Sequence, residues 1–219
     1  MKIAFLDLDG TLVDSSLRHV ETLKQLLNDC NIKYSNIADY ITYKAEGNTT
    51  KEYLIDRLNL DEKIAGKISE GWVNHIEDDL VMILDRWYED ASIFVHFLKV
   101  EGYKIYVLTA RRNVGFTESF IRNSEIWEYI DEIVTVNPKN ASKEKADFIH
   151  SLMDKNESYN ILVGDTEADY EAAKEAGIRI YVLNRGFRSK KFWDEKQVES
   201  YCSLIKIKER LVDEEKLTR

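Results

Sequence analysis

Two aspartates one residue apart, Asp7 and Asp9, directly follow the first apolar run of the chain. That run, residues 3–6, has the composition of a buried strand, and a Gly10-Thr11 pair typical of a turn comes after the second aspartate. Alternate side chains of a strand lie on the same face, so the two carboxylates can converge where the strand ends. Converging carboxylates repel each other unless a cation or a proton lies between them. Unless these aspartates only form a turn or cap a helix, they indicate a hard-metal site in which one carboxylate attacks and the other moves protons.

Later segments place further polar side chains beside the ends of predicted strands. Thr109 ends the apolar run 104–108, and Asp165 comes shortly after the apolar run 160–163. Asp169 lies four residues after Asp165, so both carboxylates can face one point if a helix begins between them. Taken alone, the threonine is an ordinary strand residue, and the aspartates fit an acidic first helical turn, which the helix dipole favours.

A lysine of the segment 138–145 can add positive charge near these carboxylates. Ser142 is a good helix N-cap and places Lys143 in the first turn of the helix that follows. A cation in that turn opposes the helix dipole and therefore needs negative charge nearby. Lys143 is the first choice because of this position, and Lys139 and Lys145 remain possible.

The elements that must position these residues alternate between strand and helix patterns. The apolar runs typical of buried strands are 3–7, 104–109, 132–136, 160–164 and 179–183, and helical patterns between the later ones cover about 113–124, 142–154 and 167–176. Such alternation predicts an α/β protein with a Rossmann-like parallel sheet and helices on both faces. Active sites in such sheets lie at the carboxyl ends of the strands, where the polar residues above are expected.

Residues 14–100 interrupt this alternation, because they contain no convincing strand and are far too long for one crossover. Their apolar residues recur with helical spacing, and Thr49–Glu52 has the pattern of an N-terminal helix capping region. We therefore predict a small all-helical cap domain of residues 15–85, inserted after the first strand. The catalytic core then consists of residues 1–14 and 86–219, and a helix at about 90–100 belongs to it.

The composition narrows the class of protein. The chain has 219 residues, of which 44% are hydrophobic and 32% charged, and its formal net charge is −9. These values are typical of a globular protein, and the negative charge argues against an extended nucleic-acid surface, which needs clustered Lys and Arg. No apolar stretch approaches the roughly 20 residues of a membrane span, and no signal region precedes the first strand. We expect a cytoplasmic protein without nucleic-acid or membrane partners.

Together the motifs resemble those of the haloacid dehalogenase-like (HAD) superfamily, in the same order along the chain. The first motif, Asp-x-Asp-Gly-Thr-Leu, stands at residues 7–12, and Thr109, a lysine and the motif Gly-Asp-Thr-x-x-Asp at residues 164–169 follow it. Residues 172–178 are similar to the helix and glycine turn of phosphoglycolate-phosphatase-like members. The insert resembles a C1-type cap in length and position. The resemblance implies a hydrolase of that branch.

The resemblance also implies a role for each aspartate. Asp7 would attack phosphorus and carry an aspartyl-phosphate, and Asp9 would protonate the leaving oxygen and later deprotonate the hydrolytic water. Mg²⁺ would bind Asp7, the backbone carbonyl of Asp9 and Asp165, with Asp169 supporting the ion through its waters.

Thr109 and the lysine would hold phosphoryl oxygens, so Lys143 is expected to be both catalytic and substrate-binding. Thr109 is followed by Ala110 and Arg111 rather than by the Asn or Ser common in the superfamily. All three residues of this segment are assigned to substrate binding, with Arg111 either reaching a substrate anion or remaining solvated.

The predicted function is that of a Mg²⁺-dependent phosphomonoester hydrolase that acts on a small phosphorylated metabolite through an aspartyl-phosphate. One alternative is a phosphomutase of the β-phosphoglucomutase type, which shares these motifs but returns the phosphoryl group to a sugar. Another is a non-catalytic module, such as a response-regulator-like receiver whose aspartate is phosphorylated as a signal. The inserted cap and Asp9 favour the enzymes, because a receiver has no use for either.

Overall fold

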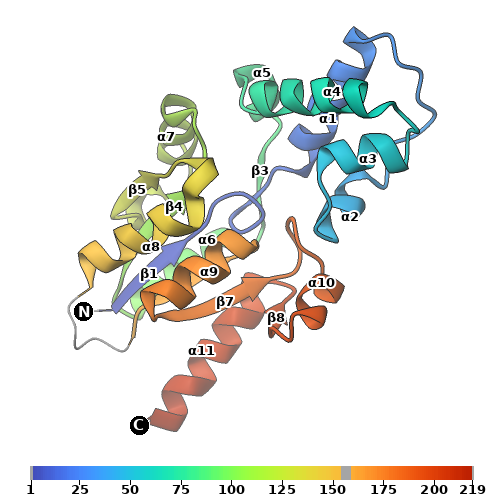
Figure 1. The fold of residues 1–219 in the computed structure, drawn as a ribbon. Helices are drawn as coiled ribbons and strands as arrows, with labels where there is room; N and C mark the ends of the chain where they lie inside the picture. Colours follow the sequence, from blue (N-terminus) through green and yellow to red (C-terminus); the bar gives the residue numbers. More distant parts are fainter. Residues whose placement is uncertain (1, 154–158, 219) are drawn as a thin grey trace.

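The chain forms an α/β core with a group of helices beyond one end of its strands (Figure 1). The computed structural model describes residues 2–153 and 159–218. Six parallel strands form the core sheet in the order β5-β4-β1-β6-β7-β8. They are β1 (Lys2–Leu6), β4 (Tyr103–Thr109), β5 (Glu132–Thr135), β6 (Ile161–Gly164), β7 (Arg179–Leu183) and β8 (Ser200–Tyr201). The predicted Rossmann-like α/β fold is thus confirmed.

Helices cover both faces of the sheet because the central strand β1 is apolar on both. Its residues Ile3 and Phe5 belong to the hydrophobic cluster on one face, and Ala4 and Leu6 belong to the cluster on the other. The first face is covered by α8 (Ala141–Leu152) and α9 (Glu167–Ala176), and the second by α6 (Ala91–Val100), α7 (Val114–Arg122) and α11 (Leu204–Thr218). The shorter elements are α10 (Lys190–Glu195) and the 3₁₀ helices η1 (Trp127–Tyr129) and η2 (Pro138–Asn140).

Five helices between β1 and β4 form the cap-like insert that the sequence predicts. They are α1 (Ser16–Asp29), α2 (Tyr40–Ala45), α3 (Thr50–Asp56), α4 (Glu62–His75) and α5 (Asp79–Met82). The insert has its own hydrophobic cluster, with Leu23, Tyr40 and Leu54 at its centre. The predicted capping region is confirmed, because the Thr49 hydroxyl accepts a hydrogen bond from the Glu52 N–H and the Thr49 N–H donates to the Glu52 carboxylate.

The two connections between core and insert run side by side (Figure 1). They form a two-stranded antiparallel sheet of β2 (Val13–Asp14) and β3 (Arg86–Trp87). Both ends of the insert therefore lie next to each other, close to the end of β1. The domain boundaries at residues 15 and 85 stay a prediction.

The sequence analysis missed the shortest strands and misplaced one helix start. β2, β3 and β8 have two residues each, too few for an alternating pattern to be recognised. The helix predicted at 142–154 begins at Ala141 with Asn140 as its N-cap, so Ser142 is not the cap. Residue 154, its predicted end, lies outside the described residues. None of the helices in the described part of the chain is long and apolar enough to cross a membrane.

The cluster inside the insert gives a stability prediction. Leu54 is fully buried there, so Leu54→Ala should lower the free energy of unfolding by about 2–5 kcal/mol, because the lost methyl groups leave a cavity. Leu80→Ala is the matched control, since Leu80 is 86% exposed and its truncation should change stability by no more than about 0.5 kcal/mol. Urea denaturation followed by circular dichroism measures both. Equal losses would contradict a separate core in the insert.

Candidate active site

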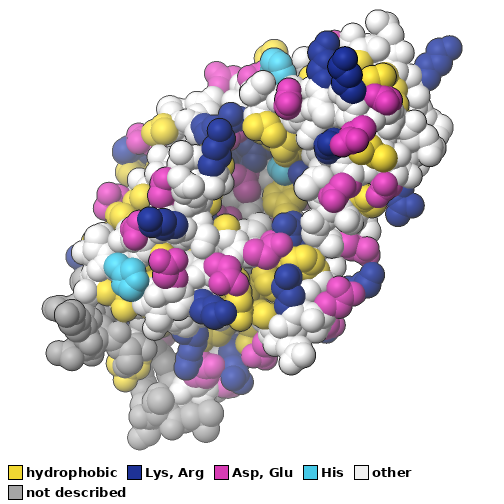
Figure 2. Space-filling model, viewed as in Figure 1, with side chains coloured by type: hydrophobic (Ala, Val, Ile, Leu, Met, Phe, Trp, Pro, Cys, Tyr) yellow, Lys and Arg dark blue, Asp and Glu magenta, His cyan; other side chains and the backbone are white. Residues whose placement is uncertain are grey.

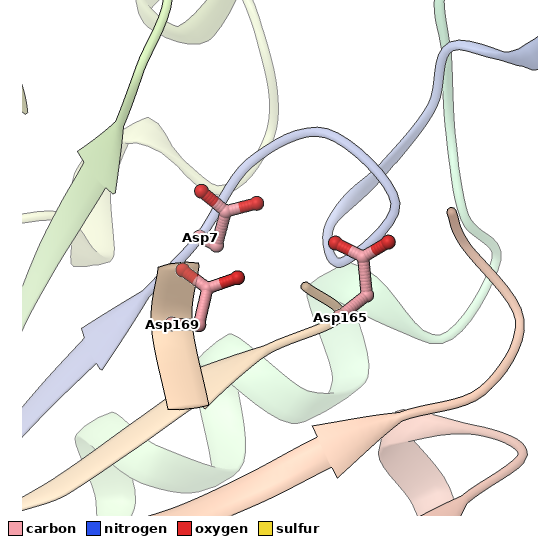
Figure 3. A group of neighbouring side chains, drawn as sticks. All are labelled: Asp7, Asp165 and Asp169. Carbon is pink, nitrogen blue, oxygen red and sulfur yellow. The ribbon is translucent and has the colours of Figure 1, made fainter. Parts of the chain in front are cut away.

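Three of the predicted carboxylates meet at the carboxyl edge of the sheet (Figure 3). Asp7 follows β1, Asp165 follows the neighbouring strand β6, and Asp169 lies in the first turn of α9. One oxygen from each lies within 4.8 Å of the others, and all three residues are buried. The parity of β1 explains the meeting: Asp7 falls in register with Ile3 and Phe5, whose face is the one that α8 and α9 cover.

The lysine that the structure places beside these carboxylates is Lys145 rather than the first choice, Lys143. The Nζ of Lys145 donates to Asp7 Oδ1 and to Asp169 Oδ1, at 2.6 Å in each case. Lys145 is 2% exposed, whereas Lys143 is exposed. Burial alone would lower the pKa of Lys145, but Asp169 and Asp7 outweigh burial and hold that pKa above its usual value.

The periodicity of α8 explains why Lys145 is the inward residue. The buried positions of this helix are Ala141, Lys145, Ala146 and Ile149, which recur at the spacing of one helix face. Lys143 precedes Lys145 by two residues, which places it on a different side of the helix, where it is exposed to solvent. The apolar stripe in the sequence contained this information, but the position of a lysine relative to the helix start did not.

The buried carboxylate of Asp165 has one oxygen that is available to bind a cation. Its Oδ2 accepts a hydrogen bond of 2.5 Å from the Phe187 N–H, while its buried Oδ1 has no hydrogen-bond partner among the described residues. Burial and the neighbouring charges of Asp7 and Asp169 raise the pKa of Asp165 well above its usual value. A side chain on Gly10 or Gly186 would overlap this carboxylate, so both positions require glycine. Three buried carboxylates with one unpartnered oxygen fit a hard divalent cation such as Mg²⁺.

Asp9 has different surroundings from the other three aspartates. Its carboxylate accepts two hydrogen bonds from Arg111, at 2.7 and 2.8 Å, and one from Arg18 at 2.5 Å. Burial favours the protonated form, but Arg111 and Arg18 outweigh it and hold the pKa of Asp9 well below its usual range. The Asp9 side chain does not belong to the group of carboxylates that could hold one metal ion. This agrees with the expectation that Asp9 would bind the metal through its backbone carbonyl.

Arg111 is not solvated, and its guanidinium group bonds carboxylates of the protein, although its buried Nη1 has no hydrogen-bond partner among the described residues. It is 3% exposed, and its Nη2 also bonds Asp85 Oδ2 at 2.6 Å. Arg18 Nε lies 3.3 Å from the other oxygen of Asp85, so two arginines and two aspartates form a buried cluster. The sequence analysis missed Arg18 and Asp85. Arg18 lies one helical turn before Thr22 on the buried side of α1, which also carries Leu23. Helical periodicity could therefore have indicated that Arg18 is buried.

A pocket of about 230 Å³ opens over these groups, between the core and the insert. Figure 2 shows the molecule hollowed between these two parts. Asp7 and Lys145 are among its lining residues, and so are Thr109, Ala110 and Arg111, the expected substrate-binding segment at the end of β4. The insert supplies other lining residues, and it contacts the core beside the pocket. There Glu77 accepts hydrogen bonds of 2.6 and 2.7 Å from two backbone N–H groups at the start of α7.

Fold, motifs and site agree with a known family. The sequence profile described as haloacid dehalogenase-like hydrolase matches residues 4–183. This match spans most of the chain, so the chain belongs to the haloacid dehalogenase-like hydrolases, as its motifs predicted.

The individual relatives are distant. The chain is 24% identical over 193 residues to a phosphoglycolate phosphatase of Aquifex aeolicus (strain VF5), which covers 85% of this chain and 86% of the relative. The fold of this chain is similar to that in the crystal structure of a predicted phosphatase from Clostridium acetobutylicum. The TM-score is 0.70, the identity is 20%, and the match covers 97% of this chain and 98% of the other. The fold is also similar to that of Mycobacterium tuberculosis protein tyrosine kinase A, with a TM-score of 0.71, 17% identity and coverage of 95% and 97%. At such identities the structural likeness shows the fold alone.

The lysine assignment can be tested by a matched pair of variants. Lys145→Met leaves Asp7 and Asp169 buried without their shared cation, which should cost about 3–5 kcal/mol in the free energy of unfolding without added metal. Lys143→Met removes an exposed charge on the same helix and should cost no more than about 0.5 kcal/mol. Chemical denaturation in EDTA gives both values. A larger loss for Lys143→Met would return the assignment to that residue.

Proposed function

We propose that this protein is a Mg²⁺-dependent phosphomonoester hydrolase that acts on a small phosphorylated metabolite through an aspartyl-phosphate on Asp7. The observation that carries the proposal is the placing of the Asp7 carboxylate. It lines the pocket, is held by Lys145 at 2.6 Å, and has Asp165 and Asp169 beside it. The family membership and the phosphatase names of the relatives support the same reaction class.

The three grouped carboxylates are the proposed metal ligands. Asp7, Asp165 and Asp169 would hold Mg²⁺, which when bound compensates their charge and polarises a phosphoryl oxygen. Lys145 balances part of that charge from the opposite side and fixes the orientation of Asp7. Thr109 and Lys145 line the pocket, where their hydroxyl and ammonium groups can donate hydrogen bonds to phosphoryl oxygens.

Asp7 and Asp9 would divide the chemistry between them. An oxygen of Asp7 forms a bond to phosphorus while the bond to the leaving oxygen breaks, and that oxygen takes up a proton. Asp9 lines the same pocket and is the nearby group for this proton. In the present arrangement Arg18 and Arg111 keep Asp9 ionised, which suits the second step, in which Asp9 takes a proton from the attacking water. To act first as an acid, Asp9 has to lose at least one of these guanidinium contacts.

The proposed nucleophile can be tested by removing its charge. Asp7→Asn preserves the shape of the side chain, so phosphate release from a panel of phosphomonoesters with Mg²⁺ should fall by several orders of magnitude in a folded variant. Asp9→Asn should also slow turnover but let radiolabelled phosphate accumulate on Asp7, because hydrolysis loses its base. Asp147→Asn, an exposed aspartate on α8, is the control and should keep full activity. Substantial turnover by Asp7→Asn protein, checked by mass spectrometry for deamidation, would overturn the mechanism.

The same assay separates a hydrolase from a phosphomutase. A hydrolase releases inorganic phosphate into water from sugar phosphates without a bisphosphate activator. A mutase instead returns the phosphoryl group to the sugar, and rearranged sugar phosphate in place of free phosphate would favour that alternative.

Metal binding should depend on pH in a direction set by the buried aspartates. Burial raises the pKa of Asp7 to about 7. The charge of Lys145 acts against this increase, and the charges of Asp169 and Asp9 add to it. The pKa of Asp165 is raised as well. Protons therefore compete with Mg²⁺ for these groups below neutral pH. The increase in melting temperature between EDTA and a fixed Mg²⁺ concentration should grow from pH 5.5 to pH 8. The difference is the quantity to compare, because stability without metal also changes with pH. The lowered pKa of His19 makes stability rise with pH over part of this range, whereas the raised pKa values of Asp7 and Asp165 make it fall. A constant difference would contradict metal binding by these carboxylates.

A further inference from the structure

Three ring side chains line the pocket on the side of Asp9. His19, which follows the Arg18 that bonds Asp9, stacks on Phe187 with ring centroids 4.2 Å apart and meets Trp72 edge-on at 5.0 Å. We call His19, Trp72 and Phe187 the aromatic wall. If Asp9 meets the leaving oxygen, as proposed above, a leaving group held in this pocket lies near these rings.

The wall joins both parts of the molecule and is held in place. His19 lies on α1 and Trp72 on α4 of the insert, and the Trp72 Nε1–H donates to the His19 carbonyl oxygen at 3.3 Å. Phe187 belongs to the core segment after β7, where its N–H is bonded to Asp165. The wall is therefore a surface to which both the core and the insert contribute.

The wall carries no charge at neutral pH. The Trp72 and Phe187 rings are neutral by nature. Burial, followed by the charges of Lys44 and Arg18, lowers the pKa of His19 well below its usual value, so its imidazole is neutral as well.

Each cation that lines the pocket bonds a carboxylate of the protein, although the buried nitrogens Arg18 Nη1 and Arg111 Nη1 have no hydrogen-bond partner among the described residues. Among the described lining residues, Arg18 and Arg111 bond Asp9, and Lys145 bonds Asp7 and Asp169, with the shortest contact of each at 2.5–2.7 Å. Glu77 adds a further carboxylate to the lining. This carboxylate accepts hydrogen bonds from the backbone N–H groups of Arg112 and Asn113 and from the Arg112 side chain. A second negative charge on the substrate would meet paired cations and an acidic neighbour, and burying it there would be costly.

The size of the pocket limits the leaving group further. Its volume of about 230 Å³ lies below the roughly 300–1,000 Å³ of pockets for drug-sized ligands. It has room for a phosphoryl group and one ring.

Building on the proposed phosphatase function, we propose that the preferred substrate is a phosphomonoester whose leaving group is a single uncharged ring, held face or edge against the aromatic wall. A leaving group with its own carboxylate, such as glycolate, is disfavoured. Ring stacking of this kind strengthens binding beyond the effect of the area that it buries.

Lys44 is the cation that could reverse this preference. Its Nζ lies 4.0 Å from the Trp72 ring centroid and 3.5 Å from His19 Nδ1, although Lys44 does not line the pocket. If it turned inward, it would attract a second anion. Lys44→Met therefore belongs in the experiment.

Binding of non-hydrolysable phosphonates, measured by calorimetry with MgCl₂, tests the proposal without requiring turnover. Methylphosphonate reports the phosphoryl site alone, benzylphosphonate adds an uncharged ring, and 3-phosphonopropionate adds a carboxylate. We expect benzylphosphonate to bind at least tenfold more tightly than methylphosphonate, and 3-phosphonopropionate no more tightly than methylphosphonate. The ratio of the benzyl to the methyl affinity should fall towards one in Phe187→Ala and in Trp72→Ala, and be largely kept in Trp72→Phe.

Trp127→Ala is the matched control, because Trp127 is a half-buried tryptophan of the core that does not line the pocket, and the ratio should be unchanged in it. Tighter binding of 3-phosphonopropionate than of methylphosphonate, lost in Lys44→Met, would overturn the proposal, and so would a wild-type benzyl-to-methyl ratio near one. Phe187→Ala keeps the test valid if Trp72→Ala does not fold, since the two residues lie in different parts of the molecule. Parallel activity assays with benzyl phosphate and phosphoglycolate distinguish a failure of the phosphatase function from a failure of the ring preference. Ring preference in binding without hydrolysis of any ester would refute the phosphatase function alone, and hydrolysis without ring preference would refute the ring alone. Absence of binding by every phosphonate would refute the ring proposal together with the phosphoryl site.

Discussion

The carboxyl edge of the sheet depends on one buried ammonium group. Lys145 bonds Asp7 and Asp169 at 2.6 Å each, and without it two carboxylates would be buried side by side with no cation of the protein between them. Such a buried cluster is stable only when its geometry satisfies each charge. One lysine does not balance three carboxylates, and the unpartnered oxygen of Asp165 shows where the compensation is incomplete. The fold thus tolerates an excess of negative charge at the point where a divalent cation fits.

A second buried cluster gives Asp9 its own electrostatic setting. Arg18 comes from the insert, Arg111 from the core, and Asp85 from the connection between them. Asp7 and Asp9 are two residues apart in the chain, yet burial dominates at the first and the two guanidinium groups at the second. Because one of these guanidinium groups belongs to the insert, moving α1 away from the core removes part of the charge that keeps Asp9 ionised. The protonation of Asp9 is in this way coupled to the position of the insert.

The sequence predicted the sheet and the meeting of Asp7, Asp165 and Asp169, because each follows from a strand pattern and from the rule that parallel strands end at one edge. It did not predict which lysine joins them, since that depends on the rotation of α8 about its axis, and the helix start was placed one residue too late. The roles of Arg18 and Asp85 were also not predictable, although helical periodicity could have placed Arg18 on a buried helix face. Their roles arise from contacts between residues far apart in the chain, such as Arg111 with Asp85, which no local pattern encodes. The rings of the wall come from α1, α4 and the segment after β7, and only the docking of the insert brings them together.

The short ribbon of β2 and β3 also bears on how the chain can fold. Pairing β1 with β4 joins residues as distant as Lys2 and Tyr103, and closing so long a loop in an unfolded chain costs conformational entropy. The helices of the insert form from local contacts, which assemble faster than distant strand pairs. Once they have packed, the ribbon brings Val13 beside Trp87, and the effective loop between β1 and β4 shrinks to residues 7–12 and 88–102, the second of which contains α6. An insertion that seems to burden the central strand pair can thereby serve as the template on which that pair closes.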